Sequence, residues 1–292
     1  MSTQQTVAVL GLGTMGHPFA ANLIAKGFDV HVWNRSPGKD DDLVAQGATR
    51  AGSVAEAVAS AEVVISMLST PEATEDVLFG NHGALAAMQE GAILAQMGTI
   101  GEEATLRLAE KAKQHYPAVV WLDAPVSGSK APAEKAQVLI LASGDEERGK
   151  AAQPVFDAIG KGTKWLGPVG AGSRMKLVVN AWLVMLMQAI NESSILADHF
   201  GFSSDDLWSV LEGGPLAAPY MKPKLAKIDN SDYSTEMALE WGLKDALLAL
   251  NEADADQLPS LSRVAEIWQK ATDNGLGEKD ISVVADYLRN KK

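Results

Sequence analysis

The chain has 292 residues, 47% hydrophobic and 21% charged, which is an ordinary globular composition long enough for one large or two medium-sized cores. Its formal net charge of −12 would repel a phosphate backbone, so we expect no nucleic-acid partner. Because it contains no cysteine, disulfides, thiolate nucleophiles and cysteine-ligated metals are excluded.

No stretch of the sequence favours a membrane segment. The longest apolar run, residues 177–190, carries Asn180 and Gln188 and is too short to cross a bilayer. The first residues lack the basic and apolar regions of a secretion signal. We therefore expect a cytoplasmic protein without a membrane partner.

A glycine-rich turn follows the first β-rich run, residues 6–10, and precedes a helical pattern over residues 16–26 and a second strand over 29–33. This order, with the G-x-G-x-x-G spacing, is typical of a dinucleotide site, in which pyrophosphate binds at the helix N-terminus. A plain glycine turn is the weaker alternative, because it does not require the flanking strand and helix. The predicted cofactor-binding residues of the turn are Gly11, Leu12, Gly13, Thr14, Met15 and Gly16.

The end of the second strand indicates which cofactor binds. An NAD site usually places an acidic residue there, whereas this chain has Asn34, Arg35 and Ser36. An arginine can pair with a 2′-phosphate, so we predict NADP(H) rather than NAD(H).

Strands and helices continue to alternate as far as residue 167, which predicts a doubly wound parallel sheet of the Rossmann type. Further strands are expected at residues 63–68, 92–96, 119–122, 137–142 and 164–166. Met67 and Leu68 end one of these strands, where parallel strands line a ligand crevice, so both are predicted to border the cofactor.

Residues 167–172 are rich in glycine and mark the expected domain boundary. We predict a nucleotide-binding domain over 1–167 and an all-helical substrate and dimerisation domain over 168–292. The second domain would begin with a long helix between Ser173 as N-cap and Gly201 as C′ residue. Later helices are expected at residues 204–212, 236–253, 260–272 and 281–289, with a break over 219–223.

Lys176 and Asn180 lie four residues apart near the start of this long helix and so share one face. A lone lysine there would most often be solvated, but a buried Asn180 must find polar partners, and a reductase needs a proton donor. We therefore predict Lys176 as the catalytic acid, facing the cofactor cleft. The helix has more apolar sides than one domain can bury, with Trp182, Met185 and Met187, which predicts a homodimer or homotetramer.

Other polar residues give weaker signals. Ser127 and Gly128 lie in a loop after a strand and would suit a small carboxylate, although a plain turn is the alternative. The pair Lys244 and Asp245, taken alone, reads as an exposed surface pair. The acidic run at residues 40–42 reads as solvated, and no histidine or acidic set has metal-ligand spacing, so no metal is expected.

Four segments together resemble the signatures of the β-hydroxyacid dehydrogenase family, and the resemblance spans nearly the whole chain. Residues 127–134 and the Asn34-Arg35-Ser36 segment are most similar to its glyoxylate and succinic semialdehyde reductase branch. The segments are Gly11–Gly16, Asp123–Gly128, Gly170-x-Gly172-x-x-x-Lys176-x-x-x-Asn180, and Lys244-Asp245.

The resemblance implies the roles of individual residues. Lys176 would be the catalytic acid and Asn180 its orienting partner, with Ser127 and Gly128 at the substrate. Thr99 and Lys244 would contact the cofactor. Asp245 would border the substrate pocket, as would Met237, which stands where the family often has an aromatic residue.

We therefore expect the NADPH-dependent reduction of a small aldehyde acid such as glyoxylate or succinic semialdehyde. The alternatives are a 3-hydroxyisobutyrate or tartronate semialdehyde dehydrogenase, an imine reductase, and a cofactor-binding protein without activity. Imine reductases and inactive cofactor-binding proteins resemble this family but usually lack the lysine found here at position 176, so Lys176 argues against these last two.

Overall fold

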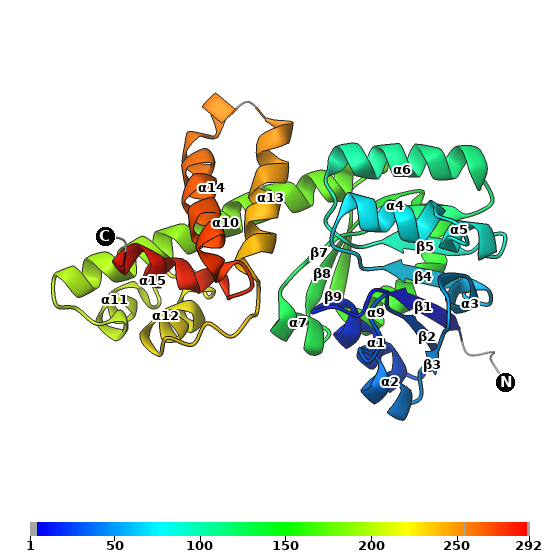
Figure 1. Cartoon of the computed structure of the whole chain (residues 1–292), viewed down its shortest axis with the longest axis horizontal. Helices are drawn as coiled ribbons and strands as arrows, with labels where there is room; N and C mark the ends of the chain where they lie inside the picture. The colour runs from blue at the N-terminus through cyan, green and yellow to red at the C-terminus, as the bar shows by residue number, and fades with distance from the viewer. Residues whose placement is uncertain (1–4, 254, 291–292) are drawn as a thin grey trace. The chain divides into compact units, whose positions relative to one another are not determined.

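The structure is a computed structural model that describes residues 5–253 and 255–290. The chain divides into two compact units, Met1–Lys176 and Leu177–Lys292. Each unit has a hydrophobic core of its own, and Figure 1 labels most elements of both. The predicted boundary at residue 167 and the separate tasks given to the two parts stay predictions.

The first unit is built on a nine-stranded sheet with the order β3-β2-β1-β4-β5-β6-β8-β7, in which β9 also pairs with β8. Its strands are β1 (Thr6–Leu10), β2 (Asp29–Trp33), β3 (Thr49–Arg50), β4 (Val63–Ser66), β5 (Ile93–Gln96), β6 (Val120–Asp123), β7 (Val126–Ser127), β8 (Val138–Gly144) and β9 (Gly160–Trp165). Strand order reverses at β1, whose neighbours are β2 and β4, and such a switch point is where ligands bind in open α/β sheets.

Helices cover both faces of this sheet because successive side chains of a strand point to opposite faces. Val7 and Val9 of β1 pack in the same cluster as Phe19 and Phe156, whereas Ala8 belongs to the cluster on the other face. The helices of the unit are α1 (Gly16–Ala25), α2 (Asp41–Ala45), α3 (Val54–Val58), α4 (Pro71–Phe79), α5 (Ala84–Ala87), α6 (Glu102–His115), α7 (Lys130–Glu134), α8 (Glu146–Gly149), η1 (Lys150–Ala152) and α9 (Gln153–Ile159).

The predicted doubly wound architecture is confirmed, but the sheet is not wholly parallel. The strands from β3 to β6 run parallel, whereas β8 is antiparallel to both β6 and β7. The short strand β7 had no sequence signal, because Val126 and Ser127 are held in it only by pairing with Ile140 and Leu139.

The 29-residue helix α10 (Ala171–His199) begins two residues before the predicted N-cap Ser173, which lies inside its first turn. Its end follows the prediction: Gly201 has φ +80°, and Phe202 N donates to Ala197 O at 2.9 Å, as in a Schellman motif. The end of α10 is therefore set by neighbouring residues, whereas its start is held by hydrogen bonds to the distant residue Asp123.

The second unit consists of helices and short turns around a core centred on Trp268. Besides most of α10 it contains α11 (Ser204–Leu211), α12 (Met221–Asp229), α13 (Leu239–Glu252), η2 (Ala255–Gln257), α14 (Pro259–Ala271), η3 (Thr272–Leu276), η4 (Ile281–Val283) and α15 (Val284–Arg289). The predicted break over 219–223 is wrong after residue 220, because Pro223 occupies the first turn of α12, where its missing N–H leaves no helical hydrogen bond unmade.

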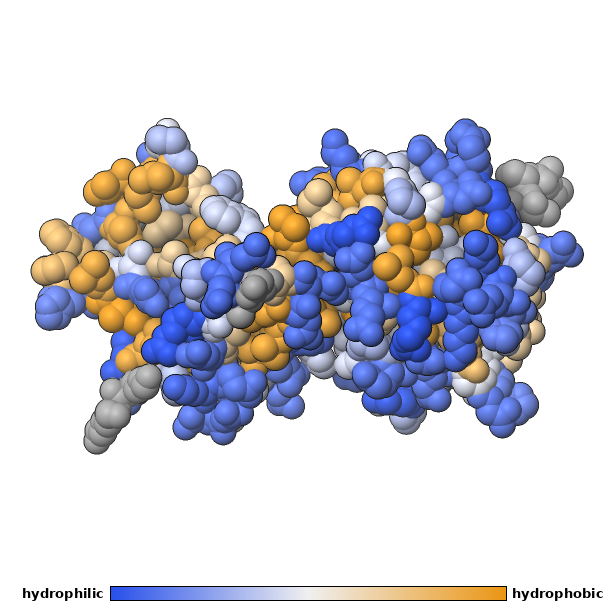
Figure 2. Space-filling model, turned by 90° about the horizontal axis from the view of Figure 1, so that it is seen from above, coloured by the Kyte–Doolittle hydropathy of each residue, from blue (hydrophilic) through white to orange (hydrophobic). Residues whose placement is uncertain are grey.

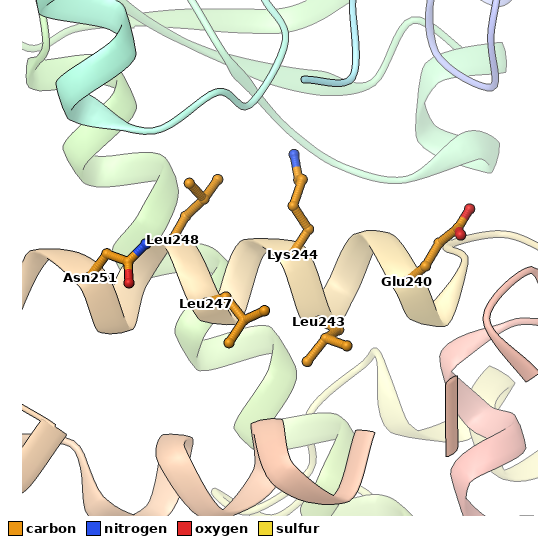
Figure 3. Close-up of a pocket in the computed structure, with 6 residues that line it drawn as sticks. All are labelled: Glu240, Leu243, Lys244, Leu247, Leu248 and Asn251. Carbon is orange, nitrogen blue, oxygen red and sulfur yellow. The ribbon is translucent and has the colours of Figure 1, made fainter. Parts of the chain in front are cut away.

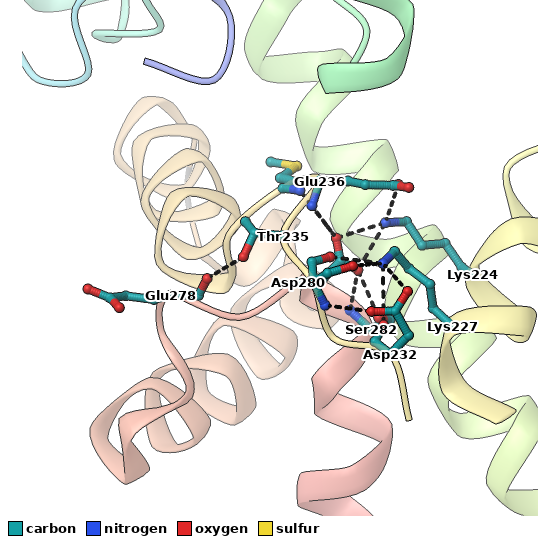
Figure 4. A network of polar contacts seen from close by, with 10 residues as sticks. Lys224, Lys227, Asp232, Thr235, Glu236, Glu278, Asp280 and Ser282 are labelled. Carbon is teal, nitrogen blue, oxygen red and sulfur yellow. Dashed lines mark hydrogen bonds and ion pairs between the residues drawn. The ribbon is translucent and has the colours of Figure 1, made fainter. Parts of the chain in front are cut away.

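A lysine and an aspartate are buried in this unit, and a partly exposed glutamate joins their ion-pair network, which Figure 4 draws. Lys224 Nζ lies 2.9 Å from both carboxylate oxygens of Asp280 and 3.0 Å from Glu236 Oε2. Asp280 also accepts hydrogen bonds from the backbone N–H groups of Glu236, Met237 and Ser282. The network therefore fixes the segment that leads into α13.

Within the described residues, no helix combines the length and apolar character needed to cross a membrane.

Candidate active site

The glycine turn after β1 has the backbone shape that a dinucleotide requires. Gly11 has φ +95°, and a Cβ there would lie 2.5 Å from Met67 O. A Cβ on Gly16 would lie 1.9 Å from Gly11 O, so helix and turn pack too closely for any side chain. A Cβ on Gly13, in contrast, would meet no heavy atom within 4 Å. The residues therefore fit a pyrophosphate that approaches the backbone at Gly13 and the N-terminus of α1.

Asn34 joins this turn to the end of β2. Its Oδ1 accepts a hydrogen bond from Leu12 N at 2.9 Å, and its Nδ2 donates to Ser36 O at 2.8 Å. The side chain thus orders the glycine turn and the Arg35–Ser36 segment together. Arg35 and Ser36 are exposed at this edge of the sheet.

The turns after β4 and β5 lie against the glycine turn and against each other. Met67 N donates to Leu10 O at 2.9 Å, and a Cβ on Gly98 would lie only 2.1 Å from Leu68 O. Thr99 follows directly and is half-buried. The structure thus brings the predicted residues Met67, Leu68 and Thr99 to the same edge of the sheet as the glycine turn.

Asp123 anchors the start of α10 and was noted in the sequence only as part of a motif. Its Oδ2 accepts from Gly170 N at 3.1 Å, Ser173 N at 2.9 Å and Ser143 Oγ at 2.9 Å, and its Oδ1 accepts from Ser173 Oγ at 2.7 Å. Burial raises the pKa of the Asp123 carboxyl, against the lowering effect of these hydrogen bonds. An acidic residue at the end of a wholly buried strand is the sequence signal that could have identified it.

The loop after Asp123 carries Ser127 and Gly128. Gly128 has φ +141°, and a Cβ there would lie 2.9 Å from Val138 Cγ1, so the chain turns where only glycine fits. Ser127 is half-buried and Gly128 is exposed. Lys176, in the second turn of α10, is also half-buried, with its helix held to this loop's strand through Asp123.

In the second unit, Asn180 and Asp245 form a buried pair. Asn180 Nδ2 donates to Asp245 Oδ2, and the two residues are 2% and 5% exposed. Lys244 Nζ lies 3.1 Å from Asp245 Oδ1. The reading of Lys244 and Asp245 as an exposed surface pair is therefore wrong, because Asp245 faces α10 rather than solvent.

Lys244 lines a hollow of about 230 Å³ along α13. Figure 3 shows Lys244 and Leu248 projecting from the same side of the helix, and Glu240, Leu243, Leu247 and Asn251 complete the lining. Met237 precedes α13 and is half-buried, with its backbone held by Asp280. No group of three or more metal-ligating side chains occurs among the described residues.

Comparison with known families decides the classification. Residues 6–167 match the family described as the NAD binding domain of 6-phosphogluconate dehydrogenase. Residues 170–288 match the family described as NAD-binding of NADP-dependent 3-hydroxyisobutyrate dehydrogenase. The chain belongs to the β-hydroxyacid dehydrogenase family. As a β-hydroxyacid dehydrogenase it is an NAD(P)-dependent oxidoreductase, so the predicted family, enzyme class and NADP(H) cofactor are confirmed.

Individual proteins are similar to this β-hydroxyacid dehydrogenase over nearly its full length. Glyoxylate/succinic semialdehyde reductase 1 of Arabidopsis thaliana is 38% identical, covering 97% of this chain and 98% of its own. The structure of Mycobacterium tuberculosis 3-hydroxyisobutyrate dehydrogenase with L-serine is 30% identical, with a TM-score of 0.85 over 98% of this chain and 100% of that one. Human cytokine-like nuclear factor N-PAC is 30% identical over 97% of this chain, which spans 51% of N-PAC's length.

Proposed function

We propose that the protein reduces a small aldehyde acid, such as glyoxylate or succinic semialdehyde, to the hydroxy acid with NADPH. The observation that carries the proposal is the 38% identity, over 97% of this chain, to a glyoxylate/succinic semialdehyde reductase. The alternative substrates are 3-hydroxyisobutyrate and tartronate semialdehyde, of which the first is supported by the similarity to a 3-hydroxyisobutyrate dehydrogenase.

The preference for NADPH over NADH rests on the end of β2. Arg35 would pair with the 2′-phosphate, and Asn34 replaces the carboxylate that would repel it. In this proposal the cofactor is bound by residues of the glycine turn, the β2 end, the next two strand ends and α13. They are Gly11, Leu12, Gly13, Thr14, Met15, Gly16, Asn34, Arg35, Ser36, Met67, Leu68, Thr99 and Lys244.

Lys176 is the proposed general acid. When bound, the nicotinamide supplies a hydride to the carbonyl carbon. Protonated Lys176 stabilises the charge that develops on the carbonyl oxygen and then donates its proton to that oxygen. Asn180 is proposed to help orient the lysine.

Substrate recognition is assigned to two segments of the chain. Ser127 and the backbone at Gly128 would bind the carboxylate, because a hydroxyl and peptide N–H groups donate hydrogen bonds to an anion. Asp245 and Met237 would border the substrate. A homodimer or homotetramer and a cytoplasmic location complete the proposal.

A substrate panel tests the reaction. Glyoxylate, succinic semialdehyde and tartronate semialdehyde are reduced, and 3-hydroxyisobutyrate oxidised, each with the phosphorylated and the unphosphorylated cofactor. We expect the highest kcat/KM with NADPH and one of the first two aldehydes. The proposal fails if 3-hydroxyisobutyrate with NAD gives the highest value, or if NADPH binds but no aldehyde is turned over.

A further inference from the structure

Three successive carboxylates follow the segment that the proposed function assigns to the 2′-phosphate. Asp40, Asp41 and Asp42 come four residues after Ser36, and the sequence gives no reason why they should not repel a phosphate or occupy Arg35. Exposed charges act over about 10 Å at 0.1 M ionic strength, so an uncompensated carboxylate within that distance of the site would weaken phosphate binding.

The structure gives each of these carboxylates a cationic or histidine partner. Arg50 Nε lies 2.6 Å from Asp40 Oδ2, and Arg50 Nη2 donates to Asp41. Asp42 Oδ1 lies 2.9 Å from Nε2 of His17. Among the residues that the structure describes, none of the three carboxylates pairs with Arg35. The reading of this run as solvated is therefore wrong for Asp40, which is 8% exposed.

Sheet register explains how Arg50 reaches these acids. Arg50 ends β3, which runs parallel to β2 with Arg50 opposite Val32, and Ala51 N donates to Val32 O at 3.0 Å. Because parallel strands end at the same edge of a sheet, Arg50 emerges beside the chain that leaves β2. Asp40 stands at the N-cap position of α2, yet its side chain makes no cap hydrogen bond and binds Arg50 instead.

We propose that Arg50 is a positioning residue for cofactor choice, resting on the proposed use of NADPH. Its guanidinium compensates the charges of Asp40 and Asp41 and occupies their carboxylates, which leaves Arg35 available to a 2′-phosphate. Arg50 itself need not contact the cofactor. The ligand recognised is the phosphate monoester of the adenosine ribose.

The experiment measures equilibrium binding of NADPH and NADH by calorimetry for Arg50→Gln. We expect the Kd for NADPH to rise roughly three- to tenfold, since a half-exposed arginine contributes modestly to electrostatic interactions. The Kd for NADH should change less than about twofold, and the NADPH defect should grow at low ionic strength. Replacing both acids as well, in D40N/D41N/R50Q, should restore most of the NADPH affinity.

Arg107→Gln is the matched control, because the Arg107 side chain is 50% exposed against 51% for Arg50 and also pairs with an acid, Glu75. It should leave both Kd values unchanged. Equal weakening of NADPH and NADH by Arg50→Gln, or no recovery in the triple variant, would overturn the inference.

Arg35→Gln separates this inference from the proposed function. If Arg35→Gln abolishes the NADPH preference while Arg50→Gln leaves it intact, only the role of Arg50 is wrong. If Arg35→Gln itself leaves the preference unchanged, the proposed NADPH site is wrong as well.

Discussion

Lys176 is the residue on which the proposed chemistry depends. It is half-buried in the second turn of α10, three residues after Ser173, whose hydroxyl is fixed by Asp123. If Lys176 donates the proton, Lys176→Met should lower kcat by about 10² to 10⁴. Because no cofactor contact is assigned to it, the Kd for NADPH should stay unchanged.

Steady-state kinetics with glyoxylate and a separate binding titration measure the two quantities. Lys164→Met, which removes an exposed lysine from β9, is the control and should behave as the wild type. A Lys176→Met enzyme with wild-type kcat would remove the lysine from the mechanism.

Asn180 shows how far a single residue can be interpreted from sequence. A polar side chain inside an apolar helical run must be hydrogen-bonded when buried, and Asn180 is 2% exposed. Its partner, Asp245, lies 65 positions away, so no local pattern could name it. The sequence therefore predicts that Asn180 makes a buried polar contact, whereas the packing of α13 determines that its partner is Asp245.

At the scale of elements, local signals predicted β1 and β2 to the residue but failed where distant groups decide. The glycine turn and the apolar runs are encoded in adjacent residues. The start of α10 is set by Asp123, which lies 50 positions before Ser173. The contact between Arg50 and Asp40 is set by the register of β3 on β2. The turn, its glycines and the cofactor class were accessible to prediction, whereas the pairing of Asp123 with Ser173 and of Asp40 with Arg50 was not.

The anchor on α10 gives an element-scale prediction. Ser173→Ala removes a hydroxyl that donates to a buried carboxylate, which should lower the free energy of unfolding by about 1–3 kcal/mol. It should also lower kcat more than it raises KM for the cofactor, since the lysine helix loses a fixed start. Ser173→Thr keeps the hydroxyl and should recover both values.

Denaturant titration and kinetics on the same samples check this prediction. Ser203→Ala, which removes the capping-box hydroxyl of α11, should cost similar stability and leave kcat unchanged. If both alanine variants lower kcat equally, the anchor acts through global stability alone.

The buried pair of Lys224 and Asp280 gives a pH-dependent prediction. Burial pushes the pKa of Asp280 up, but the charge and hydrogen bond of Lys224, together with the hydrogen bonds from Ser282, hold the pKa below its ordinary value of 3.8. A carboxyl whose pKa is lowered on folding stabilises the protein above the unfolded pKa, and this stability is lost as pH falls through the folded value. Wild type should therefore lose stability below about pH 4 more steeply than Asp280→Asn.

Thermal unfolding from pH 7 to pH 2.5 measures that difference. At pH 7, Lys224→Met should lower the free energy of unfolding by about 3–5 kcal/mol, because it leaves Asp280 charged and buried without its cation. Parallel stability curves for wild type and Asp280→Asn across the acid range would contradict the assignment.

For the whole molecule, the long helix is proposed to carry the subunit interface, and of the three residues expected there, Trp182, Met185 and Met187, Trp182 is the exposed one. Met187 is fully buried in its own unit and cannot contact another subunit, whereas Met185 is half-buried against the same core. Val178 and Trp182 lie one turn apart on α10 and are 64% and 63% exposed. On the face drawn in Figure 2, apolar side chains also come to the surface at several places over the helical unit.

A charged residue beside Val178, at position 182, tests whether this exposed face of α10 forms the interface of a homo-oligomer. A tryptophan buried between subunits contributes far more binding free energy than the residues around it. Trp182→Glu should therefore shift the protein to a smaller species. Sedimentation velocity at micromolar concentration measures the change, and circular dichroism verifies that the helices remain. Val44→Glu, at a partly exposed apolar position of α2, should keep the wild-type mass. If Trp182→Glu sediments as wild type does, subunits associate through another surface or not at all, because a buried carboxylate without a partner would not be tolerated at a real interface.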